Sequence, residues 1–243
     1  MSVNHIELSL EEIRHYLEGS NINVFVFLDN TKASEFYIRT QFIQDDDFSW
    51  TTIVPYIYRR TGLELKNEKD IADYLRSVKK YFTKDWMDSW VKKEKKECLA
   101  DIEAKKKQNA DKEARGKKAS EIVTPYVLLP LFSLKECNNK TELPPNPNLQ
   151  RRLQSLKDSG YTIAIVQYGR EKTTSTLLPF PKYKEMGYET FTKQFKARVI
   201  RLLKQRNAFE ARETSAKSLI PDHKFSEVRW DKETKAENSM EMT

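Results

Sequence analysis

Apolar residues recur at helical spacing in four segments of the chain. Ser9 and Glu12 have the spacing of a capping box, which predicts a short helix ending near Gly19. Asn67 opens a longer helix, because apolar residues from Ile71 to Trp90 recur every three or four positions. Its lysine-rich continuation, which weakens near residue 116, is predicted to project into solvent. The other two predicted helices cover residues 146–160 and 188–212.

β-branched and aromatic runs predict strands at residues 22–28, 35–43, 123–134 and 161–168. The short run 51–58 contains Pro55 and is interpreted as a helix, and residues 169–182 as a loop. Strand, helix and strand over residues 123–168 then indicate a right-handed crossover between parallel neighbours. The expected fold is α/β or α+β, with a mixed or partly parallel sheet, flanking helices and one long, charged, projecting helix.

The same pattern suggests how the chain is organised. Residues 1–66 form an N-terminal α/β part, and residues 67–122 form the long charged helix. Residues 123–213 hold the crossover and the last amphipathic helix, and residues 214–243 are polar and predicted to be flexible. We expect these parts to make one compact domain overall.

Composition narrows the class of protein and its partners. The net charge is +7, 33% of the residues are charged, and no apolar run approaches the roughly 18 residues of a membrane helix. Without a signal-peptide pattern, we expect no membrane partner and a cytoplasmic or nuclear location. Cys98 and Cys137 provide no disulfide framework. Excess positive charge favours an anionic partner, so DNA or RNA is the expected partner.

The last predicted helix has the most interpretable charged surface. Its apolar stripe contains Phe195, Val199 and Leu202, and cations fall on the opposite side. Such a face would contact phosphates, although an ordinary solvated helix has the same pattern. The predicted nucleic-acid contacts on this helix are Lys193, Lys196, Arg201 and Lys204.

Two further basic clusters are candidates. Arg59 and Arg60 follow Tyr56 and Tyr58, a combination that stacks bases and binds phosphate when the rings are exposed. Arg151 and Arg152 lie at the start of a predicted helix, where the helix dipole favours anions. The lysine-rich segment 92–118 is interleaved with acids, which favours a solvated helix over a polybasic arm.

Carboxylates offer one candidate catalytic site. Asp29, Glu35 and Asp45, the last followed by two more aspartates, lie at the ends of predicted strands. Convergent acids of this kind hold Mg²⁺ in phosphodiesterases, although strand-end acids commonly serve turns. The sequence contains no GxSxG, GxxxxGK or GxGxxG string, so no other cofactor and no catalytic nucleophile is predicted.

The sequence is therefore compatible with three functions, and it leaves open whether the protein is an enzyme. The preferred function is nucleic-acid binding, mainly through electrostatic contacts with the phosphate backbone. The first alternative is a metal-dependent nuclease that uses the strand-end carboxylates. The second is a protein-interaction or assembly component that docks through an amphipathic helix, chiefly the one starting at Asn67.

Overall fold

The computed structural model describes residues 8–30, 35–169, 172–183, 193–202 and 204. The chain divides into two compact units, residues 1–185 and 186–243. In the second unit the described helix is α6 (Lys193–Leu202). The predicted tail, and the predicted parts of the last helix at 188–192 and 205–212, lie outside the described residues.

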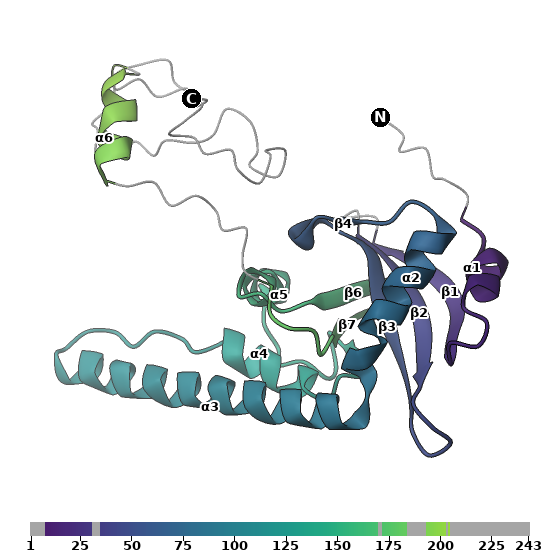
Figure 1. The fold of residues 1–243 in the computed structure, drawn as a ribbon. Coiled ribbons are helices and arrows are strands. Elements are labelled where there is room, and N and C mark those ends of the chain that lie inside the picture. Colours follow the sequence, from purple (N-terminus) through teal and green to yellow (C-terminus); the bar gives the residue numbers. More distant parts are fainter. Residues whose placement is uncertain (1–7, 31–34, 170–171, 184–192, 203, 205–243) are drawn as a thin grey trace. The chain divides into compact units, whose positions relative to one another are not determined.

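The first unit contains the other elements (Figure 1). In chain order they are α1 (Leu10–Tyr16), β1 (Ile22–Asn30), β2 (Glu35–Ile43), β3 (Ser49–Tyr58), the 3₁₀ turn η1 (Arg59–Thr61), β4 (Leu63–Glu64), α2 (Glu68–Val78), the 3₁₀ turn η2 (Lys79–Phe82), α3 (Lys84–Ala114), α4 (Thr124–Leu131), β5 (Cys137–Asn138), α5 (Leu149–Asp158), β6 (Ile163–Tyr168) and β7 (Lys172–Leu177).

The fold belongs to the mixed α+β class, with helices around two antiparallel sheets. The first sheet has the strand order β1-β2-β3-β4 and the second has the order β5-β7-β6. Every pair among the described strands is antiparallel, so the predicted parallel crossover is wrong. The partner of β6 is β7, which lies in the segment predicted to be a loop.

Proline positions explain two wrong assignments. Thr124–Leu131, within the run predicted to be a strand, form helix α4. Pro125 is tolerated in its first turn, where a missing N–H costs nothing, and Pro130 lies inside the helix near its end. Residues 51–58 lie in strand β3 instead of a helix, and Pro55 pairs with Tyr37 beside a register irregularity. Tyr56 is the extra residue there, because Phe36 and Tyr37 pair with Ile57 and Pro55.

The helix predicted from Asn67 onward is two helices. Asn67 caps α2 as expected, since its side chain accepts a hydrogen bond from the Asp70 N–H. The chain then passes through η2 to Thr83, whose extended backbone (φ −85°, ψ 151°) ends the first run. The Thr83 hydroxyl accepts from the Trp86 N–H and begins α3. The long charged helix is therefore a separate element with its own cap.

The two faces of the first sheet have different partners. Ile38 and Phe42 join the main apolar core, which includes residues of α1 and α2, whereas Tyr37 joins a smaller cluster with Val166 of β6. The extra residue in β3 shifts the alternation of side chains, because one inserted residue turns the following positions to the other face. Tyr58 consequently joins Tyr37 on the face that meets β6.

Candidate functional site

A row of polar side chains runs along β2 on the face that meets the second sheet. Glu35, Tyr37 and Arg39 alternate along the strand and therefore share that face. Glu35 and Tyr37 are buried, whereas the Arg39 side chain is 28% exposed. The row thus begins inside the protein and ends at its surface.

The inner end of the row is a buried ion pair. Lys157 of α5 is fully buried, and its ammonium lies 2.9 Å and 2.7 Å from the two oxygens of Glu35. Lys157 shares its helix face with Leu153 and Leu156, which explains why a lysine points into the core. Burial lowers the pKa of Lys157, and the neighbouring carboxylate opposes that shift.

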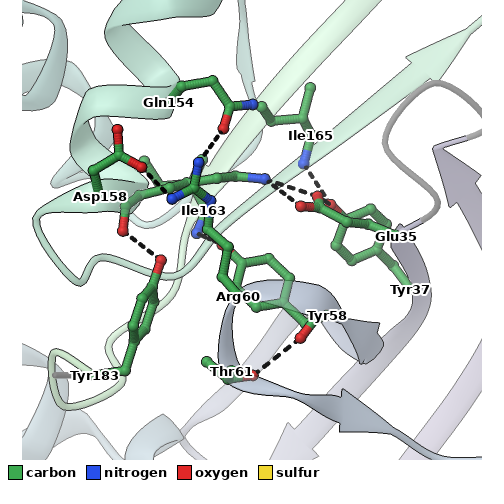
Figure 2. Close-up of polar contacts among 11 residues, drawn as sticks. Glu35, Tyr37, Tyr58, Arg60, Thr61, Gln154, Asp158, Ile163, Ile165 and Tyr183 are labelled. Atoms are coloured by element: carbon green, nitrogen blue, oxygen red, sulfur yellow. Dashed lines mark hydrogen bonds and ion pairs between the residues drawn. The ribbon is translucent and has the colours of Figure 1, made fainter. Parts of the chain in front are cut away.

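Tyrosine hydroxyls connect this pair to the edge of β6 (Figure 2). The hydroxyls of Tyr58 and Tyr37 accept hydrogen bonds of 3.3 Å from the N–H groups of Ile163 and Ile165. Tyr37 also donates to Glu35. Because β6 is an edge strand, these side chains provide acceptors for N–H groups that have no strand neighbour.

The surrounding contacts enclose the ion pair. Arg60 binds Asp158 and donates to the side chain of Gln154 over 2.6 Å (Figure 2), and the Tyr183 hydroxyl donates to the Lys157 carbonyl. Burial raises the pKa of Tyr58 well above its ordinary value. A lysine with no exposed surface has no access to a substrate, so this cluster joins α5 to the sheet and does not act as a nucleophile.

The outer end of the row opens into a polar cleft of about 580 Å³. Arg39 binds Glu136 at 2.6 Å and donates to the Tyr168 hydroxyl over 2.5 Å. Tyr168 in turn donates to Glu136 over 2.8 Å. Lys172, Asn138 and Glu142 are further lining residues. None of the cleft residues was singled out from the sequence, because they come from strands and loops far apart in the chain.

The predicted metal site does not assemble from the carboxylates proposed for it. Glu35 is neutralised by Lys157, and Asp45 accepts hydrogen bonds from the N–H groups of Asp47 and Phe48 in a turn. The antiparallel hairpin places Asp29 near Glu35, whereas Asp45 follows the other end of β2, roughly 30 Å along an extended strand. The Asp29 side chain lies outside the described part. Within that part, no group of three or more His, Cys, Asp or Glu residues could hold a metal ion.

The two tyrosine rings of the stacking platform predicted before η1 are not exposed. Tyr56 and Tyr58 are buried, so neither ring presents a face to a base. Arg60 is bound to Asp158 and Gln154 and is not free to contact phosphate. The side chain of Arg59 lies outside the described residues.

The other predicted cations occupy two different units of the chain. On α5, Arg151 is exposed, whereas the Arg152 side chain is half-buried, with an Nε that has no partner among the described residues. On α6, Arg201 and Lys204 are exposed while Phe195 and Val199 are buried, as the pattern predicted. Leu202 was predicted to share this apolar stripe, but it is 58% exposed, so that part of the prediction is wrong. The side chains of Lys193 and Lys196 lie outside the described part.

The distal end of α3 carries an excess of positive charge. Residues 105–118 contain seven lysines and arginines and only two acids. Lys105 and Lys106 are paired with Asp101 and Glu103, as expected for a solvated helix. Beyond these pairs the acids become sparse. Four exposed cations have no ion pair or hydrogen bond from their side chains to any described residue: Lys107, Arg115, Lys117 and Lys118.

The end of α3 is an ordered structure that holds these cations in place. The N–H groups of Gly116 and Lys117 bond to the carbonyls of Glu113 and Lys112, which is a Schellman motif, and Gly116 has φ +67°. The returning chain is fastened to the helix where Asn109 makes two hydrogen bonds to Ser120, of 2.6 Å and 2.9 Å. We call residues 105–118 the arm tip; Figure 1 shows it at the far end of α3.

Two remaining predictions concern protein and membrane partners. The apolar face of α2 packs in the chain's own core, since Ile71, Leu75 and Val78 are buried there. That face is therefore not available to dock another protein. None of the helices in the described part combines the length and the apolar character needed to cross a bilayer.

No family model, no curated protein and no solved structure matches this chain.

Proposed function

We propose that the protein binds nucleic acid through electrostatic contacts between the arm tip and the phosphate backbone. The observation that supports this proposal most strongly is the group of exposed cations without acidic partners: Lys107, Arg115, Lys117 and Lys118. Cations already paired with acids gain little from a phosphate, whereas unpaired ones release counterions from the polyanion when they bind. The arm tip lacks aromatic rings on which bases could stack, so we expect its contacts to be mainly with the phosphate backbone.

Charge reversal at the arm tip tests this proposal. We expect Lys107→Glu/Arg115→Glu/Lys117→Glu to weaken binding to a labelled duplex or single strand at least about tenfold at low salt, measured by fluorescence anisotropy. The control is Lys66→Glu/Lys69→Glu/Lys84→Glu, which changes net charge equally but at cations paired with Glu64, Asp73 and Asp88. Equal effects of the two triple variants would refute the assignment to the arm tip.

The second unit contributes a separate prediction. Arg201 and Lys204 are exposed in or next to α6, opposite its buried residues. If α6 also contacts phosphate, Lys196→Glu/Arg201→Glu/Lys204→Glu lowers affinity and leaves the unfolding transition unchanged. Unchanged affinity would restrict binding to the first unit.

The same binding reactions distinguish a passive binder from a nuclease. The enclosed Glu35 and the turn-forming Asp45 favour binding without cleavage. We therefore expect labelled DNA and RNA to remain intact with added Mg²⁺ or Mn²⁺. Cleavage that needs the metal would overturn the passive-binding part of the proposal.

A further inference from the structure

The cleft at the outer end of the β2 row has a nearly balanced set of charges. Its lining contains two cations, Arg39 and Lys172, and two acids, Glu136 and Glu142. Arg39 and Glu136 neutralise each other at 2.6 Å, and Lys172 and Glu142 remain as one charge of each sign. A bare phosphate would gain no net attraction here, because the acid offsets the free ammonium. The lining instead favours a neutral ligand that both donates and accepts hydrogen bonds.

Several cleft side chains are held in fixed orientations. Asn138 accepts a hydrogen bond from the Lys140 N–H with its side-chain oxygen, and Glu142 accepts from the Asn138 N–H over 2.7 Å. The guanidinium of Arg39 uses two described contacts, to Glu136 and Tyr168, out of five N–H donors. Its plane is thus fixed while some donors stay available. Side chains ordered in advance lose less entropy when a ligand binds.

These residue types match the edge and face of a nucleobase. Carboxylates accept from the amino group of cytosine, asparagine pairs with adenine, and arginine donates to guanine. Tyr168 is an aromatic residue of the cleft lining, and the Lys172 ammonium lies over its ring, 5.6 Å from the centroid. A volume of about 580 Å³ lies within the range of small-ligand sites and exceeds the needs of one base.

From this combination we infer that the cleft binds an unpaired nucleobase that carries an exocyclic amino group, with Glu142 as the acceptor of that group. The base must be unpaired, because a base inside a duplex has both faces covered by its stacked neighbours and cannot enter the cleft. The choice of a base over other neutral ligands rests on the proposed nucleic-acid function. The cleft would add base preference to the backbone contacts of the arm tip.

Cytidine and uridine test this inference, because they differ by an amino group in place of a carbonyl oxygen. In ¹H–¹⁵N NMR titrations of the full chain, we expect cytidine to shift the backbone amides of Asn138, Glu142 and Lys172. Uridine should bind about tenfold more weakly. Glu142→Gln should remove most of this preference, whereas Glu11→Gln, at an exposed glutamate of α1 outside the cleft and the arm tip, should preserve it.

The outcomes separate this inference from the proposed function. No shift of the cleft amides, equal shifts with both nucleosides, or equal effects of the two variants would overturn the inference. If the chain binds polynucleotides but nucleosides cause no shift of the cleft amides, the base site is refuted and the proposed function is not. A chain that shows the cytidine preference without polynucleotide affinity would support the base site and refute binding by the arm tip.

Discussion

The ammonium of Lys157 lies 2.7 Å from Glu35 Oε2, and the lysine side chain has no exposed surface. This pair joins α5 to β2, at the inner end of the polar row. Both charges have left water, so each depends on the other for its stability in the core.

Removing one partner of this pair should be costly. We expect Lys157→Met to lower the free energy of unfolding by about 3–5 kcal/mol, because Glu35 is left buried without its cation. The double variant Lys157→Met/Glu35→Leu should recover most of this loss, since no unpaired charge remains. Urea unfolding followed by circular dichroism measures both values. Additive losses in the double variant would contradict this account of the pair.

The tyrosine hydroxyls at the edge of β6 give a local prediction. Tyr58→Phe removes the acceptor for the Ile163 N–H, which should cost about 1–3 kcal/mol and speed hydrogen exchange at that amide. Tyr37→Phe should do the same at Ile165. Tyr16→Phe, at an exposed ring, serves as control. Unchanged exchange at both amides would show that the hydroxyls do not protect this edge.

Stability at alkaline pH should depend on partly buried tyrosines. Burial raises the pKa of Tyr183 to about 12 and that of Tyr168 to about 12, whereas phenols in an unfolded chain titrate near 10. Between pH 10 and 12 the unfolded chain has therefore lost protons that the folded chain retains, so stability falls as pH rises. Tyr183→Phe should make this decline shallower. An identical pH profile for that variant would contradict the assignment.

Gly160 tests the close packing of the chain at Tyr183 against the end of α5. It has φ +90°, and a Cβ atom there would lie 2.5 Å from the Tyr183 carbonyl oxygen. Gly160→Ala must therefore displace the backbone at Tyr183. Gly19→Ala, at φ +69° with nothing within 4 Å, has the conformational cost alone, about 1–2 kcal/mol. Thermal unfolding should show a clearly larger loss of stability for Gly160→Ala than for Gly19→Ala. Equal losses of stability would show that the backbone at Tyr183 moves aside at no cost.

Local signals in the sequence predicted the helices whose ends are capped by their own neighbours. Ser9 and Asn67 accept hydrogen bonds from residues three positions onward, and such contacts are readable from spacing. Lys84 to Ala114 was also predicted to be helical. The cap at Thr83 was missed because the apolar spacing continues across it from Val78 to Trp86.

Errors occurred where a segment's environment decides its structure. The apolar run 123–134 is buried on several sides, and burial of that kind suits a helix and a central strand equally. Strand β7 was missed because its sequence KTTSTL has no apolar alternation, although its last four residues are buried. Lys157 and Glu35 are 122 positions apart, so spacing in the sequence could not show that they form a pair.

The salt dependence of polynucleotide affinity tests the central claim most directly. Each phosphate neutralised by the protein adds close to one to the slope of log affinity against log salt concentration. We therefore expect the slope of the unaltered chain to exceed that of Lys107→Glu/Arg115→Glu/Lys117→Glu by about three. The Lys66→Glu/Lys69→Glu/Lys84→Glu variant should retain the original slope. A slope unchanged by reversal of the arm-tip cations would contradict phosphate binding at the end of α3.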